Sequence, residues 1–265
     1  SDVYKRQGLY TITHTKDSTL QIGATEDITE YRYRGASPKN YVTFNNEVWR
    51  ILGVFPTDDG TGNIENRVKL IRNESIGNKY WNTTQVSSTS SYNNWTGATL
   101  QTELNVTYLT GLTSEAQSMI GNVKYYLGGY NSKPEIKKDV MYKYERKISG
   151  STSVSYTHLT LPVGKLALMY ASDYGYAASD ECTQTLYDYD NTTCKNNNWL
   201  FNNSINQWTL PQQAGLSGDA FLVFSAGPVN YHSVDYYQYG VRPVLYLTSN
   251  VQITGGYGTS SSPYT

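Results

Sequence analysis

The side chains with the most obvious chemical potential are three histidines and a few acidic pairs, and their spacing does not favour catalysis. His14, His158 and His232 lie far apart, and none stands in a pattern such as HExxH or beside a GxSxG nucleophile turn. Acidic neighbours such as Asp180 and Glu181 occur in polar stretches, where solvated surface charge is the usual explanation. We therefore expect a protein that is not an enzyme, with no catalytic residue, cofactor or metal site.

Cys182 and Cys194 are the only cysteines, and a polar, Tyr-rich stretch without histidine separates them. The lack of histidine argues against a zinc site and favours a local disulfide. Such a bond is typical of an oxidising, extracytoplasmic setting, and closing so short a loop adds roughly 2 to 3 kcal/mol of stability. Two unrelated reduced thiols are the alternative.

A third group of residues could bind calcium, but its spacing favours turns. Asp58, Asp59 and Glu65 lie in or near the segment 57–63, which is rich in Gly and Thr. They lack the regular alternation of ligands found in calcium loops, so we interpret them as turn residues.

Recognition by contact is the chemistry that the sequence favours most. Segment 230–239 interleaves Tyr with Asn, Ser, Asp and His, and antibody binding sites use the same residue types because Tyr offers a large contact area with few torsions to restrict. Alternatively, these tyrosines pack over the protein's own loops. The predicted ligand-binding residues, including two from the preceding strand, are Leu222, Phe224, Asn230, Tyr231, His232, Ser233, Asp235, Tyr236, Tyr237 and Tyr239.

The composition limits the partners. The chain has 265 residues, with 21 Lys and Arg against 22 Asp and Glu, which gives a net charge of −1. No excess of positive charge is available for nucleic acid or an anionic membrane. Aromatic residues make up 14% of the chain, so it should fold, and no apolar run is long enough to span a bilayer.

The first elements that must position these residues are strands. Alternating residues predict strands over 30–35, 40–44, 47–55 and 67–72, with the charged residues of the last on its outer face. Asn45 and Asn46 tolerate the positive φ angles of a tight turn, so they predict a hairpin between the second and third of these strands.

Two short helices are predicted in the middle of the chain, over 94–104 and 113–121, the second with Ser114 and Gln117 as a capping pair. The segment from 130 to 147 is charged and is interpreted as irregular. Further strands are expected at 199–201, 207–210, 220–225, 229–234 and 240–247, with Pro243 marking an edge or bulge. This order predicts an α+β fold with twisted antiparallel sheets and long loops.

Six segments together resemble a bacterial domain of uncharacterised function. They are NYVTFNNEVWRILGVF (40–55), RVKLIRNESIG (67–77), LALMYASDYGYA (166–177), CKNNNWLF (194–201), WTLPQ (208–212) and the closing segment 240–264 with Gly240-Val-Arg-Pro243. The resemblance covers roughly residues 8–265. It implies a C-type-lectin-like fold, in the branch shared with formylglycine-generating enzymes and the variable proteins of diversity-generating retroelements. We accordingly divide the chain into a non-native segment 1–7, a lead-in 8–36 and a C-type-lectin-like domain 37–265.

Members of that group tend to follow a type IV prepilin-like leader, which implies an extracellular or cell-surface location. The expected function is binding of a surface protein or glycan, with a structural pilin-like subunit or a formylglycine-generating-type oxidase as alternatives. The oxidase alternative would use Cys182 and Cys194, which sit in no matching motif. The calcium-binding tripeptides of sugar-binding C-type lectins are absent. Segments 1–7 and 154–162 instead look like adaptor read-through in a metagenome-derived gene, so we infer nothing from His158.

Overall fold

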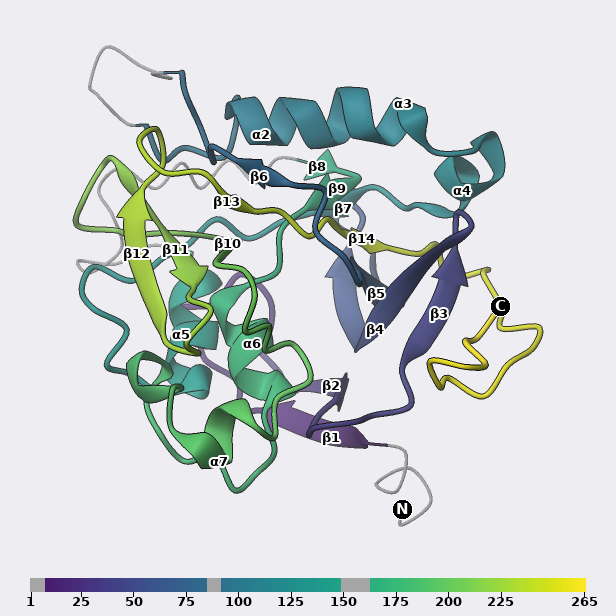
Figure 1. Ribbon diagram of the computed structural model, residues 1–265, viewed down its shortest axis with the longest axis horizontal. Coiled ribbons are helices and arrows are strands. Elements are labelled where there is room, and N and C mark those ends of the chain that lie inside the picture. The colour runs from purple at the N-terminus through teal and green to yellow at the C-terminus, as the bar shows by residue number, and fades with distance from the viewer. Residues whose placement is uncertain (1–7, 85–91, 149–162) are drawn as a thin grey trace.

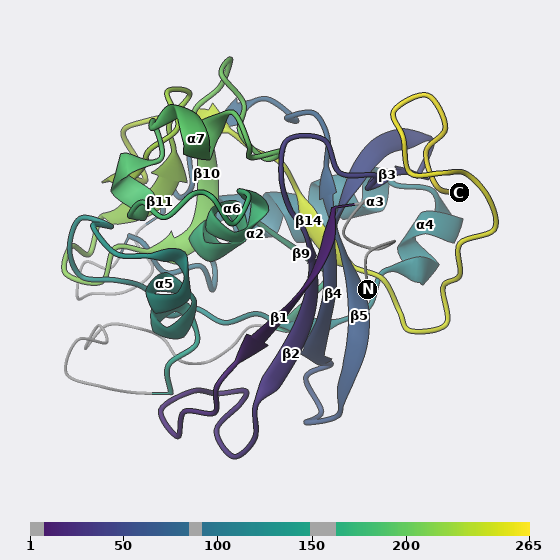
Figure 2. The same ribbon diagram turned by 90° about the horizontal axis from the view of Figure 1, so that it is seen from below.

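A larger and a smaller β-sheet, both largely antiparallel, form the framework of the protein in the computed structural model, which describes residues 8–84, 92–148 and 163–265 (Figure 1). The larger sheet has the strand order β1-β2-β4-β5-β14-β9, and β3 pairs with one end of β4. Figure 2 shows its long strands side by side, with the helices α5 and α6 at one face. The strand bounds are Leu9–His14, Ile28–Tyr33, Tyr41–Phe44, Glu47–Asp58, Ile64–Arg72, Leu166–Ala167 (β9) and Val244–Tyr246 (β14).

The predicted hairpin between β3 and β4 is confirmed. Asn45 and Asn46 have φ angles of 53° and 57°, and Phe44 pairs with Glu47 across the turn. Two consecutive positive φ angles give a turn whose twist matches that of the flanking strands, and asparagine adopts them at low cost. Local sequence therefore sets the register of this hairpin.

The smaller sheet has the order β12-β11-β10-β13-β6 and lies on the left in Figure 1. Its strands are β6 Asn78–Lys79, β10 Gln207–Gln212, β11 Asp219–Val223, β12 Val229–Ser233 and β13 Tyr239–Gly240. All its pairings are antiparallel except that of β10 with β13. A two-stranded ladder joins β7 (Val123–Lys124) and β8 (Val163–Gly164).

The helices are more numerous than the two that we expected. The first runs without a break through α2 (Thr99–Thr102), a π-helical turn (Glu103–Tyr108) and α3 (Leu109–Gly111), so it starts and ends later than predicted. The second, α4, spans Ser114–Met119, and its N-cap is Thr113, whose side chain accepts a hydrogen bond from the N–H of Ala116. The others are α5 (Lys138–Glu145), α6 (Ala171–Ala177), a 3₁₀ turn (Leu186–Asp188) and α7 (Thr192–Lys195).

Helix α6 joins the two sheets. It contacts β2 of the larger sheet and β10 and β11 of the smaller one, and it packs against α5. Every residue of α6 is buried. Helix α6 is therefore one of the elements that set the relative placement of the two sheets.

Several expectations differ from the structure. Segment 130–147 was expected to be irregular but contains α5, and 199–201 was expected to be a strand but is a turn. The strand expected over 240–247 is divided, because Pro243 cannot donate a ladder hydrogen bond and separates β13 from β14. Residues 8–36 contribute β1 and β2 to the larger sheet. The prediction that the charges of 67–72 face outward is wrong, because Arg67 and Lys69 are buried. Segments 1–7 and 154–162 lie outside the described residues.

The C-terminal segment lies beside β3, at the right in Figure 1. The backbone of Tyr264 bonds to Tyr41 and Thr43, which fixes the end of the chain against the larger sheet. Within the ranges that the structure describes, no helix has the length and apolar character that a bilayer crossing needs.

Candidate functional site

An exposed group of aromatic rings lies beside the edge strand β12. Tyr236 is 74% exposed and Tyr237 is 39% exposed, while the other rings are half-buried. We call the rings of Phe224, His232, Tyr236, Tyr237 and Tyr239 the aromatic platform. Single exposed aromatic residues are common, but a contiguous group of them marks an interaction surface more often, so the platform is a candidate contact surface.

The rings of the platform hold one another in place. Tyr237 and Tyr239 are parallel, with 5.8 Å between ring centroids, and Tyr236 meets Tyr237 edge-on at 4.9 Å. His232 lies 4.6 Å from Tyr237, and its Nδ1 shares a 2.5 Å hydrogen bond with the hydroxyl of Tyr239. Phe224 packs edge-on against His232 at 5.1 Å. Offset and edge-on contacts are the favoured aromatic geometries, so the exposed rings are partly ordered before any ligand binds.

Buried groups support the platform from below. The ring of Trp208, which is buried, lies 4.9 Å from that of Tyr239, and its Nε1 donates to the carbonyl of Lys79. The carbonyl of Val234 accepts hydrogen bonds from the N–H groups of Trp81 and Asn82. Strand β13 then pairs with β6. The loop that carries Tyr236 and Tyr237 is thus fixed at both ends.

The platform is uncharged near neutral pH. Burial lowers the pKa of His232 below its ordinary value of 6.5, and the carboxylate of Asp219 opposes this only in part. The imidazole is therefore neutral at pH 7. Asp235 is exposed beside the rings and accepts a hydrogen bond from Ser233 Oγ at 2.7 Å.

The remaining predicted contact residues are placed differently. Leu222, expected on the exposed face, is fully buried, because both faces of β11 are covered. Tyr231 is half-buried and meets Phe221 edge-on at 6.0 Å, on the opposite face of β12 from His232. Asn230 is half-buried. Leu222 therefore contributes nothing to the contact surface, and Tyr231 lies outside the platform.

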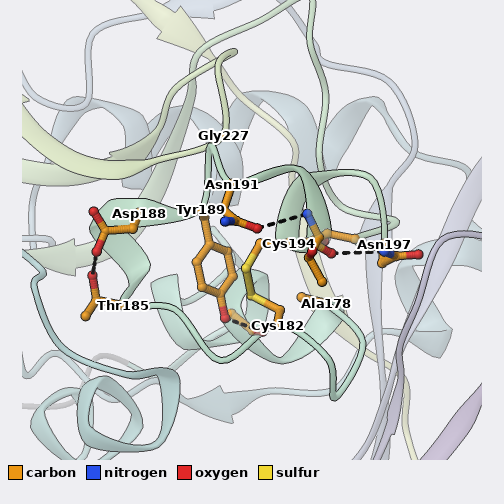
Figure 3. Close-up of a disulfide and its surroundings, with 12 residues drawn as sticks. Ala178, Cys182, Thr185, Asp188, Tyr189, Asn191, Cys194, Asn197 and Gly227 are labelled. Atoms are coloured by element: carbon orange, nitrogen blue, oxygen red, sulfur yellow. Dashed lines mark hydrogen bonds between the residues drawn. A yellow bond between two sulfur atoms is a disulfide. The ribbon is translucent and has the colours of Figure 1, made fainter.

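The predicted disulfide between Cys182 and Cys194 is confirmed, and both residues are buried (Figure 3). The ring of Tyr189 lies next to it, and the Tyr189 hydroxyl donates to the carbonyl of Gly175 in α6. The bond thus ties the loop before α7 to the interior. A formylglycine-generating-type oxidase would need a reactive cysteine pair at a substrate groove, whereas these sulfur atoms lie inside the protein.

A cluster of charged side chains lies in the interior between the larger sheet and the helices α5 and α6. We call it the buried ionic cluster. Sequence reasoning missed it, since its residues come from five separate segments of the chain. Its members are His14, Glu30, Arg32, Lys69, Glu145, Arg146 and Asp173, all of them buried.

One half of the cluster is built on Glu30. Its carboxylate accepts hydrogen bonds from Arg32 Nε at 2.8 Å and from the Tyr142 hydroxyl at 2.9 Å, and it lies 3.1 Å from His14 Nε2. Burial alone would raise the pKa of Glu30, but the charge of Arg32 and the hydrogen bond from His14 outweigh it and lower that pKa well below 4.5. Burial lowers the pKa of His14 in turn. Glu30 is therefore ionised and His14 neutral at pH 7.

The other half is built on Asp173, at the N-terminus of α6. Its Oδ1 accepts from Arg32 Nη1 at 2.8 Å, and its Oδ2 accepts from Lys69 Nζ at 2.5 Å and from the N–H of Tyr170 at 2.9 Å. Burial opposes ionisation of Asp173, but the charges of Lys69 and Arg32 hold its pKa below the ordinary value. Burial lowers the pKa of Lys69.

Glu145 and Arg146 complete the cluster. Arg146 Nη1 donates to Glu145 Oε2 at 2.9 Å, and Ser172 donates to the same carboxylate through both its N–H and its hydroxyl. Burial raises the pKa of Glu145. With His14 neutral, three acids face three bases, so the cluster has no net charge. It is closed to solvent and offers a substrate no access.

Other candidate sites carry less chemistry. Asp58 and Asp59 accept hydrogen bonds from the N–H groups of Gly60, Thr61 and Gly62, as turn residues do. Among the described residues, no group of three or more His, Cys, Asp or Glu side chains could hold a metal ion. A cavity of about 340 Å³ near the C-terminal end of α4 is lined by uncharged side chains of 118–119 and 248–254.

Comparisons with protein-family models, with curated proteins and with solved structures find no match for this chain.

Proposed function

We propose that this chain is a non-catalytic binding module of the extracellular space or bacterial cell surface, which recognises a macromolecule or glycan through the aromatic platform. The observation that carries the proposal is the exposure of Tyr236 and Tyr237 on a loop whose backbone is fixed at both ends. Ser233 and Asp235 lie close to these tyrosines in the sequence, and Asn230 lies earlier on β12; all three have polar groups that can hydrogen-bond to a ligand.

Pre-ordering of the rings favours binding. Association costs free energy for each side chain that becomes ordered on binding. Here the contacts between the rings, and the contact of Trp208 with Tyr239, already restrict these side chains in the free protein, so less ordering is needed. Each exposed tyrosine offers a flat apolar face and a hydroxyl, the combination that makes tyrosine frequent in binding hot spots. A neutral His232 adds a further polar group without adding a buried charge.

The fold and location belong to the same proposal. A C-type-lectin-like fold is supported by the motif resemblance and by the larger sheet, which contains both the N-terminal strands β1 and β2 and the closing strand β14, the latter between β5 and β9. An extracellular location is supported by the disulfide, since such bonds persist in oxidising compartments.

A glycan array and an array of surface proteins, probed with the purified protein, test the proposal. We expect a discrete set of bound probes, and we expect Tyr236→Ala with Tyr237→Ala to weaken binding to them by about tenfold or more, since truncating a hot-spot residue costs about 2 kcal/mol. The control is Tyr257→Ala, because Tyr257 is 77% exposed but lies in the C-terminal segment, at the opposite side of the molecule from β12 in Figure 1.

The control variant should bind as the unmodified protein does. If neither array yields a bound probe, or if the platform variant and the Tyr257 variant bind equally well, the platform is not a recognition surface.

A further inference from the structure

We infer that Lys69 and Asp173 condense to form an intramolecular amide bond, which covalently joins strand β5 to helix α6. The observation behind this inference is a direct contact between an amine and a carboxyl group inside a closed, largely aromatic interior. Lys69 is 1% exposed as a residue, and the side chain of Asp173 is 0% exposed. The two residues are 104 positions apart in the sequence.

The reacting atoms are already in contact. Lys69 Nζ lies 2.5 Å from Asp173 Oδ2, and a carboxyl C–O bond is about 1.2 Å long, so Nζ is at most about 3.7 Å from the carbonyl carbon Cγ. Reacting groups held at about 3 to 3.5 Å are in near-attack range, where effective concentrations greatly exceed any reached in solution. The upper bound of about 3.7 Å for the distance from Nζ to Cγ exceeds that range by only about 0.2 Å.

The surroundings exclude water and favour the neutral amine. The ring centroids of Tyr170, Tyr246 and Phe55 lie 4.5, 5.3 and 5.5 Å from Lys69 Nζ. Burial among these rings lowers the pKa of Lys69, which makes deprotonation easier. Amines attack carbonyl carbon only in the neutral form, so the burial that disfavours the ammonium promotes this half of the reaction. Burial likewise disfavours the Asp173 carboxylate, which must be protonated, whereas the charges of Lys69 and Arg32 favour it and hold its pKa below the ordinary value.

The step balances without any added reagent. A proton passes from Nζ to Oδ2 along their hydrogen bond, which converts the ammonium and carboxylate into an amine and a carboxylic acid. The nitrogen lone pair then forms a bond to Cγ, and negative charge develops on Oδ1. A second proton moves from nitrogen to Oδ2, the Cγ–Oδ2 bond breaks, and one water molecule leaves; the amide nitrogen keeps one hydrogen.

Arg32 is placed to stabilise the charge that develops. Its Nη1 donates to Asp173 Oδ1 at 2.8 Å, the oxygen that becomes the oxyanion and then the amide oxygen. A fixed cationic donor at this position acts as an oxyanion hole does in acyl transfer. The N–H of Tyr170 donates to Oδ2 and holds the departing oxygen.

Charge balance also favours the product. The condensation removes one positive and one negative charge from the buried ionic cluster. Two ion pairs remain, Glu30 with Arg32 and Glu145 with Arg146, with nitrogen-to-oxygen distances of 2.8 and 2.9 Å. Burying an ion pair costs desolvation free energy that its attraction often fails to recover. A neutral amide in the same place avoids that cost.

Mass spectrometry of the whole, denatured chain after reduction of the disulfide tests the inference. We expect the purified, folded protein to be lighter than its sequence mass by one water molecule, and a protease digest to yield a branched peptide that links the segments containing Lys69 and Asp173. Lys69→Met removes the amine and should restore the full sequence mass of that variant. The control is Lys165→Met, because Lys165 Nζ donates to the carbonyl of Gln117 and takes no part in the cluster; this variant should still lose one water.

The measurement on the unmodified chain decides the matter even if Lys69→Met fails to fold. A full sequence mass after prolonged incubation of the folded protein overturns the inference. Loss of water that persists in Lys69→Met also overturns it, because the dehydration then lies elsewhere.

Discussion

Replacing Glu30 by glutamine removes one negative charge from the interior and leaves the shape almost unchanged. In the folded protein the carboxylate of Glu30 is bound by Arg32, His14 and Tyr142, and the side chain is 4% exposed. The side-chain oxygen of glutamine can accept only part of these hydrogen bonds. Its NH₂ group would face groups that themselves donate, such as the guanidinium of Arg32 or the hydroxyl of Tyr142. Arg32 would keep only its contact with Asp173 Oδ1.

The expected loss is large because the site is closed to water. Removing one partner of a buried ion pair costs about 3 to 5 kcal/mol, most of it from the charge that is left without compensation. We therefore expect Glu30→Gln to lower the free energy of unfolding at pH 7 by that amount. Glu135→Gln, on an exposed residue, is the matched control and should change stability by less than about 0.5 kcal/mol.

The pH dependence identifies the cause of the loss. Since the pKa of Glu30 is lower in the folded protein than its ordinary value of 4.5, the stabilisation by its charge is fully present above pH 4.5 and declines as the pH falls below it. The measurement is urea unfolding of the unmodified protein and of Glu30→Gln at pH 7 and at a series of lower pH values. The free energies of unfolding of the two proteins should converge as the pH falls. A difference below about 1 kcal/mol at pH 7, or one that does not shrink in acid, would refute the electrostatic explanation.

Three further changes have outcomes set by local geometry. Replacing Cys182 and Cys194 by alanine should lower the free energy of unfolding by about 2 to 3 kcal/mol in urea titrations under oxidising conditions. The variant should be about as stable as the unmodified protein with its disulfide reduced. Asn46→Val should cost about 1 to 2 kcal/mol in the same assay because φ is 57°, whereas Asn46→Gly should not destabilise; equal effects would contradict the turn argument. Gly53→Ala should cost about 3 kcal/mol in thermal unfolding, since an added Cβ would lie 2.0 Å from the carbonyl oxygen of Tyr31; a neutral result would mean that β2 and β4 separate easily.

Features that depend on neighbouring residues could be predicted from the sequence. The Asn45-Asn46 hairpin rests on adjacent residues and the disulfide on cysteines 12 positions apart, while the α+β class rests on the order of such local segments. Helix α4 began within one residue of its predicted start, with Thr113 in place of Ser114 as the cap, because both offer a hydroxyl.

The buried charges could not be predicted in this way. The alternation in the predicted segments 30–35 and 67–72 indicates strands, which the structure has over Ile28–Tyr33 and Ile64–Arg72. A period of two shows only which residues share a face and not which face is covered. Tyr31 is 42% exposed whereas Arg32 is buried, the reverse of what their types suggest. The covering elements are α5, which sequence reasoning interpreted as irregular, and α6, whose every residue is buried and which therefore shows no polar face.

The two sites connect through the same helix. The aromatic platform belongs to the smaller sheet, whereas Lys69 and Glu30 belong to the larger one, and α6 contacts both sheets. Asp173 in α6 contacts Arg32 and Lys69 of the larger sheet, so these contacts contribute to the placement of the smaller sheet relative to the larger one. A contact surface made of a few rings gains affinity when its scaffold does not rearrange on binding. The buried charges, which look costly when counted one by one, thus have a physical role in keeping the exposed tyrosines in a fixed place.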